Sequence, residues 1–121
     1  MLAKKHKLSR THDIAGIFSR GRFLHGRYMT VHYRNSDRPS PLFAIAISTK
    51  VVKKAVIRNR LRRQIFEIIR LNLDLTKDKN YDIVFVARKN IAETSRKELK
   101  EDVLRLLAKI PENRNRPSLI V

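Results

Sequence analysis

The sequence predicts one α+β domain, a two-layer sandwich in which three helices pack on a mixed sheet of about four strands. Residues 95–110, and a basic segment that ends near residue 71, repeat apolar side chains at the spacing of amphipathic helices. Residues 28–34 alternate between apolar and polar side chains, and residues 42–48 and 81–87 are short apolar runs, as in strands. With a further helix and a short strand near the N-terminus, the expected order is α-β-β-β-α-β-α.

The chain before residue 26 predicts the first helix and the first strand. Ser9 or Thr11 can cap the free amide groups at the start of a helix, and Gly21 is typical of its end. The apolar side of this helix is formed by Ile14, Ile17 and Phe18. Residues 22–25 then predict a short strand.

Residues 28–34 predict a strand with two different faces. The apolar face carries Met29, Val31 and Tyr33. The other face carries Tyr28, Thr30, His32 and Arg34. Two rings, a hydroxyl group and a guanidinium group in one row are unusual for a sheet face.

The rest of the chain follows the same periodicities. Residues 35–41 predict a loop, and residues 42–48 predict a strand that is covered on both faces. The basic helix follows, to about Leu71 or Leu73, and its buried stripe comprises Ile57, Leu61, Ile65 and Ile68. A polar connector over 75–80 leads to a largely buried strand over 81–87.

The last helix is predicted from its cap and its stripe. Ser95 and Glu98 have the spacing of a capping box. The buried positions are Leu99, Val103, Leu106, Leu107 and Ile110. Pro111 ends the helix, so we expect a single domain over residues 1–110 and a flexible, mildly basic tail over 111–121.

Positive charge is concentrated in the first half of the chain. The sequence has 28 Lys and Arg against 11 Asp and Glu, a net charge of +17. Residues 1–66 hold 16 of the basic residues and only 2 of the acidic ones. The run from Lys50 to Arg63 contains seven Lys or Arg. Because self-repulsion destabilises the compact state, this imbalance indicates a polyanionic partner, and a nucleic acid fits it best.

Composition also excludes several classes of protein. The absence of Cys removes disulfides and thiolate chemistry and is typical of a cytoplasmic protein. No apolar run is long enough to cross a membrane, and no hydrophobic stretch follows the basic N-terminus, as a secretory signal requires. The four histidines are scattered, and the basic half offers only Asp13 and Asp37 as carboxylates. We therefore expect neither a catalytic residue nor a metal site in this chain.

Phe66 is the one aromatic residue on the polar side of the basic helix. At 100° per residue it falls among Asn59, Arg62, Arg63 and Arg70. An exposed ring flanked by guanidinium groups can stack an unpaired base while the charges hold phosphates. Alternatively, the ring packs under a neighbouring element and belongs to the core, and the sequence leaves both readings open.

The start of the basic helix is a candidate anion site. Lys50, Lys53 and Lys54 lie in or just before its first turn, where the helix dipole already places positive charge. A bound phosphate would relieve this repulsion, whereas a solvated run of charges would cost only a few tenths of a kcal/mol. We favour the phosphate because the surrounding sequence is so basic.

Residues 55–63, Ala-Val-Ile-Arg-Asn-Arg-Leu-Arg-Arg, closely resemble the signature helix of the bacterial ribonuclease P protein component. That family shows an Arg-Asn-Arg core followed by an apolar residue and two basic residues, after a strand and a basic loop. The resemblance extends over roughly residues 7–108, including the first helix over 8–18 and the last strand with its basic exit over 81–89.

The resemblance implies a fold and a function. The fold has three helices on a four-stranded sheet, with a left-handed crossover between its parallel strands. The function is that of the protein subunit of ribonuclease P, a ribonucleoprotein endonuclease that removes the 5′ leader of precursor tRNA. The implied partners are ribonuclease P RNA and the precursor tRNA leader, with no membrane and no obligate protein partner. The RNA subunit carries catalysis and holds the Mg²⁺ ions.

The resemblance also implies roles for individual residues. The residues expected to bind the RNA subunit are Lys53, Lys54, Arg58, Asn59, Arg60, Arg62 and Arg63. The residues expected to bind the single-stranded leader are Ile14, Phe18, Tyr28, Thr30, His32, Lys50, Phe66 and Arg88. Apolar and aromatic surface in the second group suits unpaired nucleotides, whose faces are free to stack. Phe18 has an alternative reading as a core residue of an amphipathic helix.

Three other functions compete with this one. A ribosome-associated or general RNA-binding protein would have similar surface chemistry and no processing role. A DNA-binding module would place the basic helix in the major groove, but nothing resembles a helix-turn-helix pair. A protein-only nuclease would need clustered carboxylates that the sequence lacks.

Overall fold

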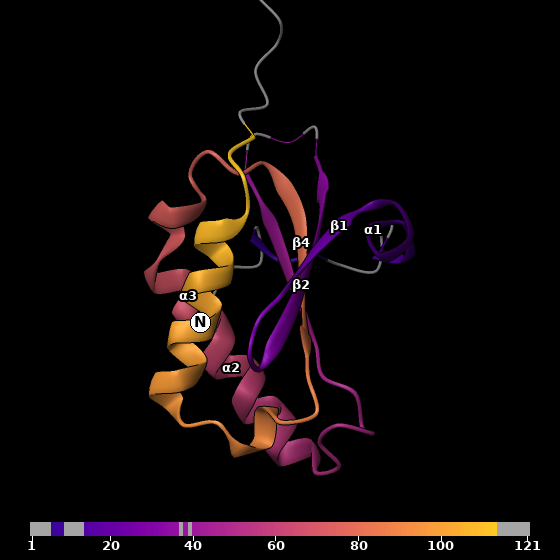
Figure 1. Ribbon diagram of the computed structural model, residues 1–121, viewed down its shortest axis with the longest axis vertical. Coiled ribbons are helices and arrows are strands. Elements are labelled where there is room, and N and C mark those ends of the chain that lie inside the picture. The colour runs from indigo at the N-terminus through magenta and orange to yellow at the C-terminus, as the bar shows by residue number, and fades with distance from the viewer. Residues whose placement is uncertain (1–5, 9–13, 37, 39, 114–121) are drawn as a thin grey trace, which may run out of the picture.

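The computed structural model describes residues 6–8, 14–36, 38 and 40–113, and its elements follow the predicted order (Figure 1). The three α-helices are α1 (Ile14–Arg20), α2 (Ala55–Leu71) and α3 (Arg96–Lys109). The four strands are β1 (Arg22–His25), β2 (Met29–Asn35), β3 (Leu42–Ala46) and β4 (Tyr81–Ala87). Two short 3₁₀ helices, η2 (Leu73–Thr76) and η3 (Ile91–Glu93), were not predicted.

The strands form one mixed sheet in the order β1-β2-β4-β3. β1 pairs with β2 and β2 with β4 in antiparallel fashion, whereas β3 and β4 are parallel neighbours joined through α2. In Figure 1, α2 and α3 lie together on one side of the sheet and α1 lies on the other. The α1 side of the sheet is exposed mainly at β1, where Phe23 and His25 are exposed, whereas Val84 of β4 is buried.

The core lies between the sheet and the layer of α2 and α3. Met29, Val31 and Tyr33 of β2 are buried there, as the alternation of this strand predicts. The last helix also follows its pattern, since Leu99, Val103, Leu106, Leu107 and Ile110 are all buried. On α2, Leu61, Ile65 and Ile68 are buried while Ile57 is half-buried, and Ile69 joins the stripe.

The start of α3 is closed by the predicted capping box. The Ser95 hydroxyl accepts a hydrogen bond from the Glu98 backbone N–H at 3.1 Å, and the Ser95 N–H donates to the Glu98 carboxylate at 3.4 Å. These bonds satisfy two amide groups that the first turn of a helix leaves unpaired.

The third strand differs from its prediction. β3 ends at Ala46 instead of residue 48, and Ala44, Ile45 and Ala46 are half-buried or exposed instead of covered on both faces. The reason is topological, because β4 inserts between β2 and β3 and leaves β3 at the edge of the sheet. Lys7 and Leu8 pair with part of this edge, and the Leu8 N–H donates to the Phe43 carbonyl at 2.7 Å.

The two ends of the predicted domain hold the expected caps of the first helix and the start of the expected tail. Ser9 and Thr11, the expected caps of the first helix, lie outside the described residues. The expected tail begins with an attached segment, because the Asn113 N–H donates to the Asp78 carbonyl at 2.6 Å and the Asn113 carbonyl accepts from the Asn80 N–H at 3.1 Å. Residues 111–113 therefore belong to the folded domain, whereas the sequence assigned them to a flexible tail.

A buried carboxylate organises the turn between β1 and β2. Asp102 of α3 is 1% exposed and accepts three backbone N–H groups, from Arg27 at 2.8 Å, Tyr28 at 2.9 Å and Met29 at 3.1 Å. A Cβ atom at Gly26 would lie 2.8 Å from both Asp102 oxygens, so only glycine fits this close approach. The turn is thereby fixed to a helix more than 70 residues later in the chain.

Candidate nucleic-acid interface

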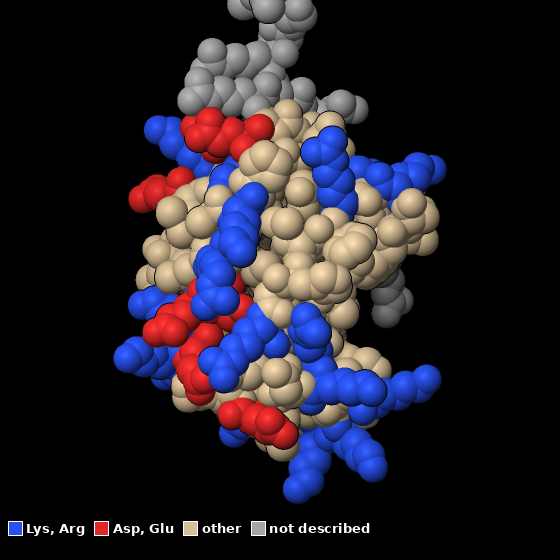
Figure 2. Space-filling view, in the orientation of Figure 1, with Lys and Arg blue, Asp and Glu red and all other residues tan. Residues whose placement is uncertain are grey.

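The first half of α2 and the loop before it present most of the predicted RNA-binding residues. Figure 2 shows Lys and Arg gathered at the lower end of the molecule, where α2 begins. Lys50, Lys53 and Lys54 are exposed there, and the first turn of α2 has neither an acidic residue nor a side-chain cap. Since the helix dipole adds positive charge at this end, the site favours an anion.

Arg58 holds the loop in place as well as adding charge. Its Nη1 atom donates to the carbonyl oxygens of Val52 at 2.9 Å and Lys53 at 2.7 Å. Part of the Arg58 hydrogen-bonding capacity is therefore used within the protein, which positions Lys53 and Lys54 relative to the helix. The sequence prediction treated Arg58 only as an RNA contact.

Phe66 is packed, so of the two readings that the sequence left open for this ring, the structure agrees with the core one. The Phe66 side chain is 7% exposed, and Lys7 Nζ lies 4.6 Å from the ring centroid. The sequence could not show this because the pairing of Lys7 and Leu8 with the β3 edge brings Lys7 over α2. Nevertheless, Phe66 contributes to the wall of a cavity of about 490 Å³, which Val56 and Arg62 also line.

The RNA-facing surface of α2 continues along that cavity. Asn59, Arg62 and Arg63 line it, and Arg62 Nη1 donates to the Asn59 side-chain oxygen at 3.0 Å. This bond orients the Arg62 guanidinium group while leaving its other N–H groups available. The cavity therefore combines an apolar wall with a cationic rim, which suits an RNA segment.

The α1 side of the sheet carries a cluster of aromatic rings. His32 of β2 lies edge-on to Phe18 of α1, with ring centroids 4.7 Å apart, and 5.8 Å from Phe23 of β1. Phe23 also contacts His25 at 5.0 Å, and His25 Nδ1 lies within hydrogen-bond distance of the Thr30 hydroxyl at 3.2 Å. We call these five residues the aromatic face.

The aromatic face contains three of the predicted leader-binding residues and two that were not predicted. Phe18, Thr30 and His32 meet there, and Phe18 is 44% exposed, so it is not a core residue. Phe23, 56% exposed, and His25 were missed. The β1–β2 pairing, which sets Phe23 beside His32 and His25 beside Thr30, could have identified them.

Tyr28 lies away from the aromatic face, contrary to the alternation of residues 28–34. It is 5% exposed and its hydroxyl donates to Glu98 Oε2 of α3 at 2.8 Å. This bond raises the pKa of Tyr28 and lowers the pKa of Glu98. The register explains the difference, because β2 begins at Met29 and Tyr28 belongs to the turn held by Asp102.

Three further predicted leader residues, Ile14, Lys50 and Arg88, lie outside the aromatic face. Ile14 is half-buried at the start of α1. Arg88, just after β4, donates through Nη1 to the Gly26 carbonyl at 3.0 Å and lines a cavity of about 410 Å³ with Val51. Lys50 is exposed on the adjoining loop. The loop before α2 and the exit of β4 thus come together at one end of the sheet.

His32 should be a neutral ring at pH 7. Burial lowers its pKa from 6.5, and His25 lowers it further by like-charge repulsion. The His32 ring binds a proton at a higher pH in the unfolded chain than in the folded protein. Protonation of His32 should therefore lower the free energy of unfolding as the pH drops below about 6.5 and should have no effect above that pH.

The pH titration of the ring C–H signals by NMR, assigned with His32→Gln, measures this directly. Phe18→Ala should move the His32 pKa back towards 6.5, because the truncation opens one side of the ring to water. A His32 pKa at or above 6.5 in the parent protein would contradict the buried-ring account.

Neither a metal centre nor a membrane segment is found in the part of the chain that the structure describes. No group of three or more His, Cys, Asp or Glu side chains there could hold a metal ion. Among the same residues, no helix combines the length and the apolar character that crossing a membrane requires.

Comparisons with known proteins agree with the fold and with the basic helix. A family model described as Ribonuclease P matches residues 2–111. The ribonuclease P protein component of Caldanaerobacter subterraneus subsp. tengcongensis is 34% identical over 111 residues, which cover 92% of this chain and 94% of that protein. The corresponding protein of Syntrophomonas wolfei is 32% identical over 109 residues, 90% of each chain.

Solved structures give the same result. The RNase P protein from Thermotoga maritima superimposes with a TM-score of 0.79 at 30% identity, and the match covers 87% of this chain and 97% of that one. The RNase P protein of Staphylococcus aureus has a TM-score of 0.77 at 21% identity, with 87% and 96% covered, and supports the fold alone.

Proposed function

Because this chain belongs to the ribonuclease P protein family, we propose that it is the protein subunit of a ribonucleoprotein endonuclease that removes the 5′ leader of precursor tRNA. The observation that carries the proposal is the separation of two surfaces with different chemistry. One is the cationic first half of α2, which suits RNA backbone. The other is the aromatic face, which suits unpaired bases.

The two surfaces are proposed to bind two different RNA segments. The RNA subunit is assigned to the α2 surface, through Lys53, Lys54, Arg58, Asn59, Arg60, Arg62 and Arg63. The single-stranded leader is assigned to the aromatic face, with Ile14, Lys50 and Arg88 at its margins. Tyr28 and Phe66 are packed and are proposed to shape these surfaces instead of stacking bases.

Catalysis is assigned to the RNA subunit together with Mg²⁺. The described surface of this chain does not suit a divalent cation, because its exposed side chains near α2 are cationic and its carboxylates are not clustered. The protein's part is to bind and position RNA. We further propose that residues 1–113 act as a single RNA-binding unit in the cytoplasm.

A cleavage assay on 5′-labelled precursor tRNA at low Mg²⁺ tests the proposed function. It compares the protein alone, ribonuclease P RNA alone, and both together. Cleavage at the mature 5′ end should require the RNA and should be faster with the protein present. Tight RNA binding without any gain in cleavage would instead favour a ribosome-associated or general RNA-binding protein.

The aromatic face should make cleavage sensitive to the length of the leader. His32→Ala or Phe23→Ala removes a stacking surface worth about 1–3 kcal/mol per base, so the protein-bound RNA should bind long-leader precursors about tenfold more weakly. Precursors with a one-nucleotide leader should be nearly unaffected.

Leu75→Ala is the matched control, because Leu75 is an exposed apolar residue far along the chain from the aromatic face. Substrate affinity is measured for both leader lengths with each variant. Equal losses on long and short leaders would show that the leader binds elsewhere.

A further inference from the structure

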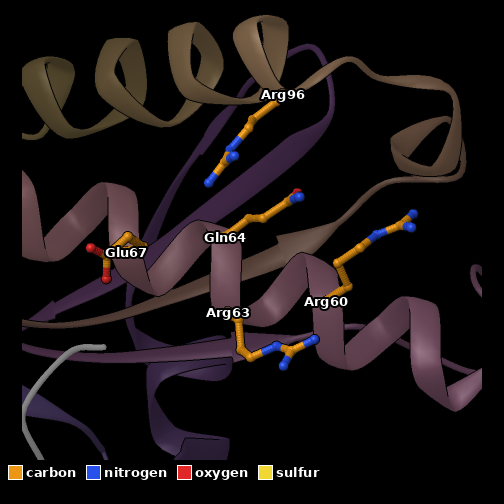
Figure 3. Close-up of a pocket in the computed structure, with 5 residues that line it drawn as sticks. All are labelled: Arg60, Arg63, Gln64, Glu67 and Arg96. Carbon is orange, nitrogen blue, oxygen red and sulfur yellow. The ribbon is translucent and has the colours of Figure 1, made fainter.

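A groove between α2 and α3 is lined by cations of the signature helix and by three further cations of α3. Two adjoining cavities of about 370 and 690 Å³ form it, and both are lined by Arg96. Its cations are Arg60 and Arg63 of α2 and Arg96, Lys97 and Lys100 of α3. We call this feature the interhelical groove. Figure 3 shows Arg96 extending from the start of α3 towards α2, where Gln64 and Glu67 line the facing wall.

The five cations of the interhelical groove have no direct acidic partner among the described residues. Of these residues, Glu67 is the one acidic residue that lines either cavity. Its carboxylate already accepts hydrogen bonds from Arg70 Nε at 3.0 and 3.1 Å, which are the largest cause of a lowered pKa of Glu67. Within the described residues, none of the five cations makes a hydrogen bond or an ion pair. Their mutual repulsion disfavours the folded state unless an anion binds.

The lining of the groove favours RNA backbone over an unpaired base. No aromatic ring lines either cavity; the uncharged walls are formed by Gln64, Ile68, Leu71 and Asn72. A stacked base needs a flat ring surface, as on the aromatic face, whereas phosphate oxygens need only positioned cations. Guanidinium groups on α2 and α3 can therefore hold successive phosphates from two sides.

The position of the groove indicates which RNA would occupy it. Arg63 lines both this groove and the cavity beside Phe66, so the two adjoin at this residue. The groove lies on the helical side of the molecule, whereas the aromatic face lies on the other side of the sheet. We infer that the backbone of the RNA subunit continues from the signature helix across the interhelical groove, with Arg96, Lys97 and Lys100 as further contacts. This inference rests on the proposed function.

The double variant Arg96→Gln/Lys100→Gln tests the inference. Loss of two phosphate contacts should reduce the slope of log affinity against log salt by about 1.8 and weaken binding of ribonuclease P RNA about 10- to 30-fold near physiological salt. Lys77→Gln/Lys109→Gln removes the same charge from exposed positions outside the groove and should leave the slope within about 0.3 of the parent protein. Equal slopes for the two variants would overturn the inference.

Site-directed cleavage of the bound RNA distinguishes direct contact between the groove and the RNA from a non-specific effect of positive charge on affinity. The chain has no Cys, so Lys97→Cys and Lys109→Cys each give one attachment point for an iron chelate that cleaves nearby RNA. Lys97→Cys should cut the bound RNA subunit at defined nucleotides, and Lys109→Cys should not. If Lys97→Cys cuts nothing while an Arg62→Cys probe cuts, the groove is empty and the proposed function still stands. If the parent protein does not stimulate cleavage at all, the proposed function itself fails.

Discussion

Asp102→Ala is expected to lower the free energy of unfolding by about 3 kcal/mol, because it leaves two buried backbone N–H groups and one partly buried one without an acceptor. Each unsatisfied donor costs about 1–3 kcal/mol, and water entering the space recovers part of that. The whole domain is stabilised by only about 5–15 kcal/mol, so the loss is large. Urea unfolding followed by circular dichroism measures it.

Two further variants separate the role of Asp102 from that of its helix. Asp102→Asn keeps the shape and one acceptor oxygen, so its loss should be smaller than that of the alanine variant. Glu101→Ala removes the neighbouring carboxylate, which is exposed on the same helix, and should change stability by less than about 0.5 kcal/mol. If the Asp102 and Glu101 variants were equally stable, the backbone bonds to Asp102 would not matter to the fold.

Arg62→Ala/Arg63→Ala is expected to weaken binding of the RNA subunit about 30-fold near physiological salt and to make the salt dependence less steep by about 1.8. Both side chains line the cavity beside Phe66, and Arg63 also lines the interhelical groove. Their loss therefore removes two phosphate contacts, one of them at the point where the cavity beside Phe66 meets the interhelical groove. Filter binding over a range of salt concentrations measures affinity and slope together.

A control variant that loses the same amount of positive charge elsewhere decides whether the position of these arginines matters. Lys77→Gln/Lys109→Gln serves again, since it lowers the net charge by the same amount. At about 1 M salt, where phosphate contacts contribute little, all three proteins should bind similarly. RNA affinity that stays at the parent level in the arginine variant would remove α2 from the proposed interface.

The sequence predicted the elements well where local signals are strong. The capping box of Ser95 and Glu98 and the stripe from Leu99 to Ile110 depend on residues close in the chain, and the structure confirms them. The basic helix was equally clear, because charge and apolar spacing coincide in one segment.

The sequence could not predict features that depend on register or on distant pairing. Phe23 lies beside His32 because of the β1–β2 register, and Lys7 lies over the Phe66 ring because residues 7 and 8 pair with the β3 edge. No sequence pattern singles out Asp102, yet it accepts hydrogen bonds from a turn more than 70 residues earlier in the chain. Such contacts join residues far apart in the chain, so the periodicity of a single segment does not predict them.

The position of β4 in the sheet also bears on how the chain is made. β4 lies between β2 and β3 although it is synthesised after both, so the sheet cannot extend beyond the β1–β2 hairpin until residue 87 has left the ribosome. By then the nascent chain already carries most of its positive charge, next to the RNA of the ribosome itself. Folding of this domain is therefore a late event in synthesis, and its long-range strand pairing must compete with non-specific binding of the unfolded basic segment to RNA.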